Sequence, residues 1–270
     1  MAVGYLQMLE STNAADIGEF LKKSLESFSI PLDNIRSVCT NGGRIAVQAC
    51  KDVFGEANHL VCLNKTLDSV VNKSLITISA LKDLNSKLEA IVKFFKQSNI
   101  AAQLKNEQMK KPDTTLSKTL VLIESLSSSW KSILKSLQRF VLLLPEVKTV
   151  LASISSSEST TDAPKLDDSF VKSLTSIEPL LTVFETISDR LSESNVAPRS
   201  GSSIIEILFL LHHATTYETT DHLTVQFIDN MSRELKKGFE DTFSNTVLAA
   251  ANLLDPRYTT TFFLFRIKKK

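Results

Sequence analysis

The sequence predicts a mostly α-helical protein with a small α/β part near its N-terminus. Residues 34–75 read in the order strand, turn, helix, strand, helix. After residue 75, apolar residues recur at spacings of three, four and seven, the period of helices with one buried face. The length of 270 residues suits one large domain or two small ones.

The α/β part starts with a short apolar-leaning strand at 36–40, which runs into Asn41-Gly42-Gly43. A polar residue followed by two glycines breaks a strand and suits the entrance to a helix. Apolar residues at helical spacing then predict a helix over 45–54, and Gly55 closes it, as glycine often does at a helix end.

Three more elements complete this part. A second short strand is predicted at 59–63, followed by a helix whose apolar face spans 67–75. Ahead of the first strand, Asn13 and the acidic Asp16 mark the start of a helix that continues to Phe28.

The remainder is predicted to be helical with two loops. A long amphipathic helix begins at Leu81 and breaks near Pro112, and Pro145 suits either a break or the first turn of a helix. Stretches rich in serine and other loop-forming residues predict loops at 153–165 and 195–203. Further helices are predicted at 120–141, 170–191, 204–211 and 223–239.

Composition narrows the functional classes. A net charge of +1 argues against a generally basic surface that binds nucleic acid non-specifically, but it does not exclude a local basic groove. Three cysteines at unpaired spacings indicate reduced thiols in an intracellular protein. No apolar run reaches the ~18 residues that a membrane span needs, and the N-terminus lacks a signal-peptide pattern. Lys268-Lys269-Lys270 is too short for a targeting signal.

Several segments resemble the catalytic domain of hAT-superfamily transposases and their BED-zinc-finger relatives. In that family one strand ends in Thr-Asp-Asn-Gly and the next in Cys-x-x-His. This chain has Asn41 at the position of the Asp and Lys65 at the position of the His. The segments that carry the resemblance are Thr40-Asn41-Gly42-Gly43, Val47-Gln48-Ala49, Phe54-Gly55, His59-Leu60-Val61-Cys62, Thr66-Leu67 and Val70-Val71.

Two later motifs extend the resemblance. Ser129-Trp130-Lys131-Ser132 is similar to the family's Arg-Trp-Asn-Ser and keeps Trp130 and Ser132. Leu254-Asp255-Pro256-Arg257-Tyr258, followed by a phenylalanine, is the most specific match. The resemblance therefore runs in the family's order from about residue 11 to 263.

The resemblance implies a fold and a domain organisation. Residues 1–75 would form part of an RNase-H-like sheet, 76–258 a large all-α insertion domain, and 259–270 the start of the return toward the sheet. The earlier strands and the zinc finger of the family would precede Met1, and its dimerisation region would follow Lys270.

The resemblance also predicts that catalysis is lost. The family uses three acidic residues to hold two hard divalent ions, because such ions prefer anionic oxygen ligands. The second acid corresponds to Asn41, and the other two would lie outside the chain. We therefore expect no enzyme activity, no catalytic residue, no metal and no cofactor.

Three functional hypotheses follow. The first is a non-catalytic, domesticated or decayed transposase-like protein whose helical part binds DNA, weakly and in a salt-sensitive manner, or a protein partner. The second is an incomplete piece of an active transposase, and the third a purely structural helical interaction protein. The resemblance to this family implies a location in the nucleus, and without the resemblance the cytoplasm is expected. Neither a membrane nor a small-molecule substrate is expected.

Several residues have a structural and a functional interpretation. Asn41-Gly42-Gly43 is expected as a turn, although helix starts also bind phosphate. Cys62 and His59 are expected on opposite faces of a strand, which argues against a nucleophile–base pair, and with Cys39 and Cys50 they match no compact zinc finger. Trp130 is expected in the core, Arg257 as a partner of Asp255, and the lysines of 82–111 on a solvated face or facing DNA.

Overall fold

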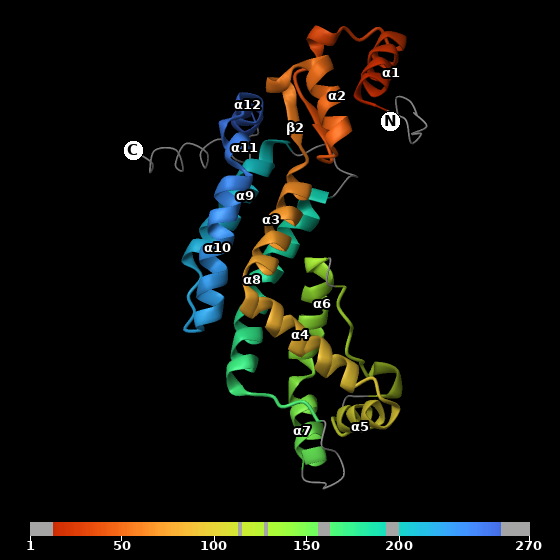
Figure 1. Ribbon diagram of the computed structural model, residues 1–270, viewed down its shortest axis with the longest axis vertical. Coiled ribbons are helices and arrows are strands. Elements are labelled where there is room, and N and C mark those ends of the chain that lie inside the picture. The colour runs from red at the N-terminus through yellow and green to blue at the C-terminus, as the bar shows by residue number, and fades with distance from the viewer. Residues whose placement is uncertain (1–12, 113–114, 127–128, 156–162, 193–199, 255–270) are drawn as a thin grey trace. The chain divides into compact units, whose positions relative to one another are not determined.

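The computed structural model describes residues 13–112, 115–126, 129–155, 163–192 and 200–254 (Figure 1). Within these ranges the protein is mostly α-helical with a two-stranded parallel sheet, which confirms the predicted fold class. Helices and strands follow one another in the order that the sequence predicts, apart from the differences described below.

The chain forms two compact units. Unit 1 comprises residues 1–69, 190–209 and 235–270, and unit 2 comprises 70–189 and 210–234. These units are divided differently from the predicted ranges 1–75, 76–258 and 259–270. Helical periodicity tells which face of a helix is buried but not which partner covers it, so a segment distant in sequence can belong to the N-terminal unit.

Unit 1 begins with helix α1 (Ala14–Ser27), whose start after Asn13 is as predicted and forms a capping box. The side-chain oxygen of Asn13 accepts hydrogen bonds from the backbone N–H groups of Ala15 and Asp16 at 2.9 and 3.1 Å, and the Asp16 carboxylate accepts one from the Asn13 N–H at 3.0 Å. Helix α1 packs on α2 (Arg44–Phe54), and Gly18 permits a close approach, because a Cβ there would lie 3.1 Å from Cγ2 of Val53.

The parallel sheet pairs β1 (Val38–Thr40) with β2 (His59–Val61). Helix α2 and a short 3-10 turn connect the two strands, as parallel strands require a crossover between them (Figure 1). Gly55 ends α2 with φ of 87°, which confirms the predicted glycine stop. The predicted strands at 36–40 and 59–63 are thus present but shorter.

Helix α3 (Leu63–Thr77) follows β2 directly, and Leu67, Val70 and Val71 are buried as predicted. Other segments of unit 1 come from later in the chain: the first part of α9 (Ser200–Thr216), the end of α10 (His222–Gly238), α11 (Glu240–Ser244) and α12 (Thr246–Leu254). The loop predicted at 195–203 therefore ends earlier than expected, because α9 already begins at Ser200.

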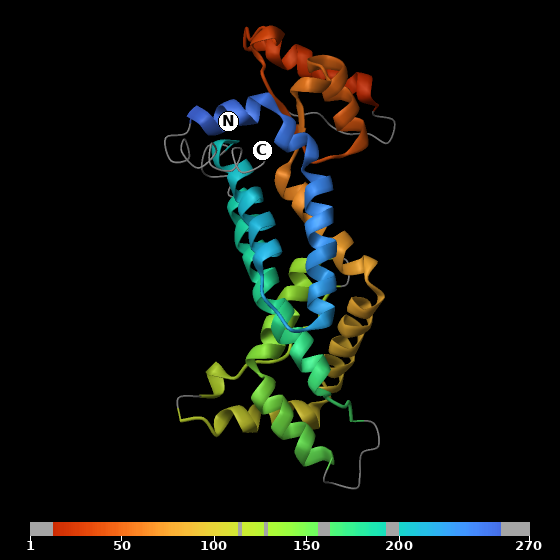
Figure 2. The ribbon, with the colours of Figure 1, turned by 90° about the vertical axis from the view of Figure 1, so that its left-hand side faces the viewer.

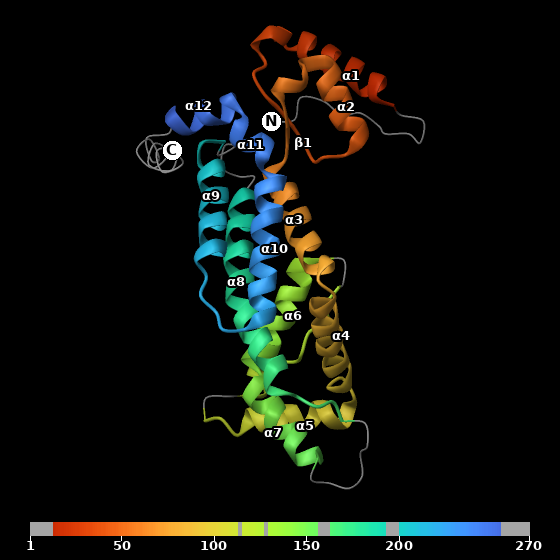
Figure 3. The ribbon, with the colours of Figure 1, turned by 60° about the vertical axis from the view of Figure 1, so that its left-hand side comes forward.

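Unit 2 is a helical unit with a buried aromatic and aliphatic core. Trp130, Phe140, Phe184 and Phe227 are all less than 2% exposed. Its helices can be followed in Figures 2 and 3. They are α4 (Ser79–Phe94), α5 (Ser98–Met109), α6 (Trp130–Leu142), α7 (Leu144–Ser155), most of α8 (Asp168–Ser192) and parts of α3, α9 and α10.

The long helix predicted from Leu81 to near Pro112 is wrong in one respect, because it is divided into α4 and α5. The break lies at Gln97, whose backbone is extended. Phe94 and Phe95 are neighbours in sequence and both buried, with their rings in edge-to-face contact at 5.8 Å. Both phenylalanines therefore contribute to the core immediately before the break.

The helix predicted over 120–141 starts ten residues later than expected, at Trp130. The stretch 119–126 has no regular secondary structure, and side chains from the helices bind its backbone. Gln108 bonds both the N–H and the C=O of Leu120, at 2.8 and 2.9 Å, and Arg139 donates to the C=O of Val121 at 2.9 Å. These partners replace the hydrogen bonds that a helix would have supplied.

Two prolines of unit 2 lie inside helices. Pro145 occupies the first turn of α7, where a missing N–H costs nothing. Pro179 lies within the continuous helix α8. The hydroxyl of Tyr217 donates to the C=O of Ser176 at 2.8 Å, in the turn that precedes this proline. Pro179 lacks the N–H that would bond the C=O of Thr175, and Tyr217 adds a donor at the neighbouring C=O of Ser176.

Candidate functional site

The candidate site is the edge of the sheet where both strands end. Parallel strands bring their carboxyl ends to one edge, and ligands of α/β proteins bind there. Strand β1 leads into Asn41-Gly42-Gly43 and β2 leads into Cys62. The structure therefore brings Thr40, Asn41 and Cys62 together at this edge.

Thr40 connects the two strand ends. Its C=O accepts a hydrogen bond from the N–H of Cys62 at 2.7 Å, which extends the sheet by one residue. Its hydroxyl lies 3.0 Å from Nε2 of His59 and also accepts a bond from the N–H of Gly42 at 3.3 Å. Burial, with a smaller contribution from Lys51, lowers the pKa of His59, so the neutral imidazole is favoured beside this hydroxyl.

Asn41 acts in the turn itself. Its side-chain oxygen accepts a hydrogen bond from the N–H of Gly43 at 3.0 Å, and the side chain is exposed. Gly42 has φ of 86°, and a Cβ there would lie 3.3 Å from Cγ1 of Val61. Both the positive φ and the short distance to Val61 favour glycine at this position. The expected structural turn is therefore present, with the amide oxygen occupied by the backbone.

The cysteines of this unit are free thiols. Burial and the neighbouring Cys62 raise the pKa of Cys39, which keeps its thiol protonated and makes it a poor nucleophile. Burial also raises the pKa of Cys50. The imidazole of His59 is hydrogen-bonded to the hydroxyl of Thr40 on the neighbouring strand, where Thr40 pairs with Val61. None of the described His, Cys, Asp and Glu residues forms a group of three with metal-binding geometry.

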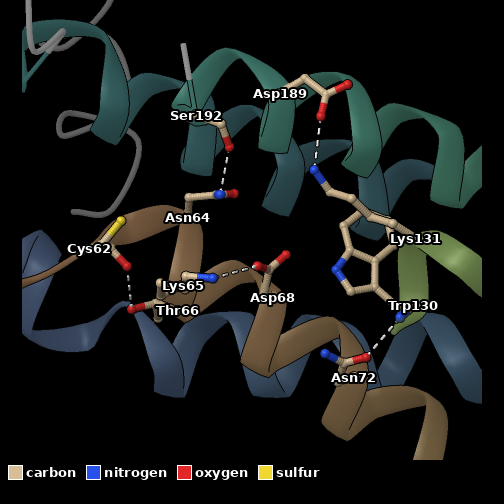
Figure 4. Close-up of polar contacts among 10 residues, drawn as sticks. All are labelled: Cys62, Asn64, Lys65, Thr66, Asp68, Asn72, Trp130, Lys131, Asp189 and Ser192. Carbon is tan, nitrogen blue, oxygen red and sulfur yellow. Dashed lines mark hydrogen bonds and ion pairs between the residues drawn. The ribbon is translucent and has the colours of Figure 1, made fainter. Parts of the chain in front are cut away.

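Lys65 lies in the first turn of α3, after β2 (Figure 4). Its ammonium is exposed and lies 3.9 Å from a carboxylate oxygen of Asp68. In the same turn the hydroxyl of Thr66 donates to the C=O of Cys62 at 3.3 Å, and Asn64 donates to the hydroxyl of Ser192 at 2.6 Å. The strand end thus presents a cation where the resembled family has an imidazole.

The described side chains of this edge are a hydroxyl, an amide, a thiol and an ammonium. Such groups bind anions or form hydrogen bonds, and they are poor ligands for hard divalent cations, which prefer anionic oxygens. A groove of about 560 Å³ lies nearby in unit 1, with Lys51, Glu56 and His59 in one wall and Asp241 and Thr246 in another.

Trp130 and Ser132 of the second motif belong to unit 2 and have structural roles. Trp130 is 1% exposed, which confirms the expected core position. Its backbone N–H donates to the side-chain oxygen of Asn72 at 3.0 Å (Figure 4). Lys131 extends over the indole ring at 5.8 Å and pairs with Asp189 at 2.8 Å. The hydroxyl of Ser132 accepts the N–H of Leu126 at 2.8 Å and so holds the end of the extended stretch.

The third motif lies mostly beyond the described residues. Leu254 ends α12 and is 82% exposed. Asp255, Pro256, Arg257 and Tyr258 lie outside the part of the chain that the structure describes, and the expected pairing of Asp255 with Arg257 stays a prediction.

Sequence reasoning missed several polar residues of unit 2 that organise its interior. Gln108 is 5% exposed. It lies four residues after the buried Leu104, and this helical spacing could have indicated that Gln108 is buried as well. Asp221 is 7% exposed and caps α10 by accepting bonds from the N–H and hydroxyl of Thr224 at 2.9 and 2.6 Å. Its other oxygen accepts the hydroxyl of Ser173 at 2.9 Å, a partner 48 residues away that no local pattern indicates.

Among the described residues, no helix combines the length and the apolar character that a membrane crossing needs. The chain matches no model of a known protein family, and a search of curated proteins finds no similar sequence.

Proposed function

We propose that this chain is a non-catalytic relative of hAT-superfamily transposases that acts by binding, through its helical unit, in the nucleus. The observation that supports the loss of catalysis is the role of Asn41. Its side-chain oxygen accepts the N–H of Gly43 within the turn. The residue that aligns with a metal-binding acid in the resembled family is thus a neutral structural cap. The parallel strand pair with its connecting helix is compatible with a part of an RNase-H-like sheet.

The chemistry of the edge supports the same proposal. Strand transfer assisted by two metal ions needs anionic ligands that lower the pKa of the attacking water and stabilise the leaving oxygen. Lys65 places a positive charge on the first turn after β2, and it would repel a cation at this edge.

The test is a cleavage assay with wild type and Asn41→Asp on supercoiled plasmid, in Mg²⁺ and in Mn²⁺. We expect neither protein to nick the plasmid above a no-protein control, because one restored carboxylate does not make a two-metal site. Asn34→Asp is the matched control, since it makes the same chemical change in an exposed 3-10 turn. Cleavage by Asn41→Asp alone, abolished by EDTA, would refute the assignment of this edge to the active site of the resembled family.

The binding surface that we propose for DNA is the lysine-rich pair of helices α4 and α5. Residues 79–111 contain seven lysines and three acidic residues. Lys82, Lys93 and Lys105 are exposed and form no ion pair with any residue that the structure describes. Lys82 and Lys93 lie eleven residues apart, about three helical turns, so they project from the same side of α4. Contacts between lysine and phosphate need little geometry, which suits such a stripe.

Fluorescence anisotropy with a labelled duplex tests this surface. Binding should weaken as salt rises, with a slope of log K against log salt of about −0.9 for each phosphate contact. Lys82→Gln/Lys93→Gln/Lys105→Gln should flatten that slope. The control Lys22→Gln/Lys135→Gln/Lys148→Gln removes the same charge from other exposed positions and should leave the slope unchanged. Equal effects of the two triple variants, or no binding at micromolar protein, would refute the DNA proposal.

A protein partner is the second candidate, because unit 2 also exposes large apolar side chains. Leu116, Val121 and Leu126, all in or beside the extended stretch, are 65, 70 and 68% exposed. Solvent-exposed apolar residues on one short segment are a feature of interaction surfaces. Sedimentation velocity of wild type and of Val121→Asp/Leu126→Asp would test the simplest case, self-association. A wild type that stays monomeric at high concentration would exclude that case.

A further inference from the structure

All three cysteines of the chain, Cys39, Cys50 and Cys62, belong to unit 1. Cys39 lies on β1, and Cys50 lies on the connecting helix α2. Cys62 follows β2 directly and precedes α3 (Figure 4). Cys39 is exposed, Cys62 is half-buried and Cys50 is buried. Solvent and small solutes therefore have access to the end of the strand pair where Cys39 and Cys62 lie.

Cys39 and Cys62 lie on the same face of the sheet. In the register of the parallel strands Cys39 pairs with Leu60, and paired residues direct their side chains to the same face. Cys62 comes two residues after Leu60, and a spacing of two returns a side chain to that face. The pairing of the strands continues as far as Cys62, because its N–H donates to the C=O of Thr40 at 2.7 Å.

The contacts of the thiols agree with this register. The thiol of Cys39 donates to the C=O of Thr40 at 3.8 Å, and the N–H of Cys62 donates to the same oxygen. Burial, followed by the charge of Cys62 and a hydrogen bond with its side chain, raises the pKa of Cys39, and Cys50 contributes least. The two thiols at the strand ends therefore lie within interaction range of each other.

We propose that Cys39 and Cys62 are a redox-sensitive dithiol, which a small disulfide such as oxidised glutathione converts reversibly into an intramolecular disulfide. One cysteine thiolate attacks a sulfur of oxidised glutathione and releases one glutathione. The other thiolate attacks the protein sulfur of this mixed disulfide, forms the Sγ–Sγ bond and releases the second glutathione. The two departing glutathione thiolates take up the two thiol protons, and the two electrons of the dithiol reduce the glutathione disulfide.

The bond would close a loop from Cys39 to Cys62 that contains the turn Asn41-Gly42-Gly43 and helix α2. Such a cross-link stabilises a fold mainly by restricting the unfolded chain. Oxidation would therefore hold the ends of the two strands together more firmly. The proposal is independent of DNA binding, because it concerns unit 1 and not the lysines of α4 and α5.

Peptide mapping of wild type identifies the pair. The protein is equilibrated in buffers with different ratios of oxidised to reduced glutathione, quenched with acid, capped with N-ethylmaleimide and digested. Trypsin cleaves after Arg36, Arg44, Lys51 and Lys65, so each cysteine falls on a different peptide. We expect a link between peptides 37–44 and 52–65 that dithiothreitol removes, with Cys50 left to react with N-ethylmaleimide. The raised pKa of Cys39 slows exchange near neutral pH, so the equilibrium is measured and not the rate.

The same buffers with urea give the matched comparison. The effective concentration of the pair should be at least about tenfold higher in the native than in the unfolded protein, because the fold already brings the two thiols together. Cys50→Ala should keep the link, whereas Cys39→Ser and Cys62→Ser should lose it.

Four results would overturn the proposal. They are equal effective concentrations in the two states, a link between peptides 37–44 and 45–51, a link between two chains, and a glutathione adduct without any internal link. The comparison of native and unfolded wild type decides the case even if a variant does not fold.

Discussion

Replacing Gln108 with alanine should destabilise unit 2 markedly. Gln108 is 5% exposed and makes two hydrogen bonds to the backbone of Leu120, with its Oε1 accepting at 2.8 Å and its Nε2 donating at 2.9 Å. A third, longer contact joins Nε2 to the C=O of Leu104 at 3.4 Å. The extended stretch 119–126 has no strand partner, so this side chain takes the place of a neighbouring strand.

The expected cost follows from these contacts. Alanine leaves the N–H and the C=O of the partly buried Leu120 without partners, at about 1 kcal/mol each, and removes one methylene worth about 0.8 kcal/mol. We therefore expect a loss of roughly 2–3 kcal/mol in the free energy of unfolding, or a fall of about 4–12 °C in Tm. Urea unfolding followed by the fluorescence of Trp130, the single tryptophan and a core residue of unit 2, measures it.

Gln103→Ala is the matched control, because Gln103 lies on the same helix and is exposed. It should change the free energy of unfolding by less than about 0.5 kcal/mol. If Gln108→Ala costs no more than this control, the stretch 119–126 does not depend on the glutamine, and the explanation given for its extended conformation is refuted.

Three further predictions concern single side chains. Gly42→Ala should cost about 1–2 kcal/mol because of its positive φ, and Gly43→Ala less, which urea titrations can compare; equal costs would contradict the strain argument. The pKa of His59 is lowered from 6.5 by burial, so the folded state binds its proton less readily than the unfolded chain does, and stability should fall as the pH drops below about 6.5. Unfolding midpoints at pH 7.5 and 5.5 should differ less in His59→Gln than in wild type, and an unchanged difference would exclude His59 as a contributor. Tyr217→Phe should cost about 1 kcal/mol through loss of its bond to the α8 backbone, measured by thermal melting; no change in Tm would show that this bond does not stabilise α8.

Local elements were largely predictable from the sequence. The turn at Asn41-Gly42-Gly43, the capping box at Asn13 and the stop at Gly55 each depend on residues within a few positions of one another. Their hydrogen bonds and backbone angles are local, so the sequence contains all the information that they need. The same holds for the buried faces of the helices, which follow from the 3.6-residue period.

Two predictions failed for reasons that helical periodicity does not show. The extended course of residues 119–126 depends on Gln108, Arg139 and Ser132, which outweigh the helical spacing of its apolar residues. The division between α4 and α5 lies at Gln97, in a stretch without the proline or glycine that often marks a break. Periodicity alone does not reveal either effect, because it counts apolar positions and not the groups that meet them.

The candidate site shows the same division of information. The order strand, turn, helix and strand around Asn41 could be read from the sequence, because glycines, the helical period and short apolar runs are local features. Packing in three dimensions decided that Cys62 meets Thr40 at one edge of the sheet, and that Asn72 holds Trp130 from 58 residues away. Hydrogen-bond partners are chosen by distance in space, and side chains far apart in the chain become neighbours only when the helices pack.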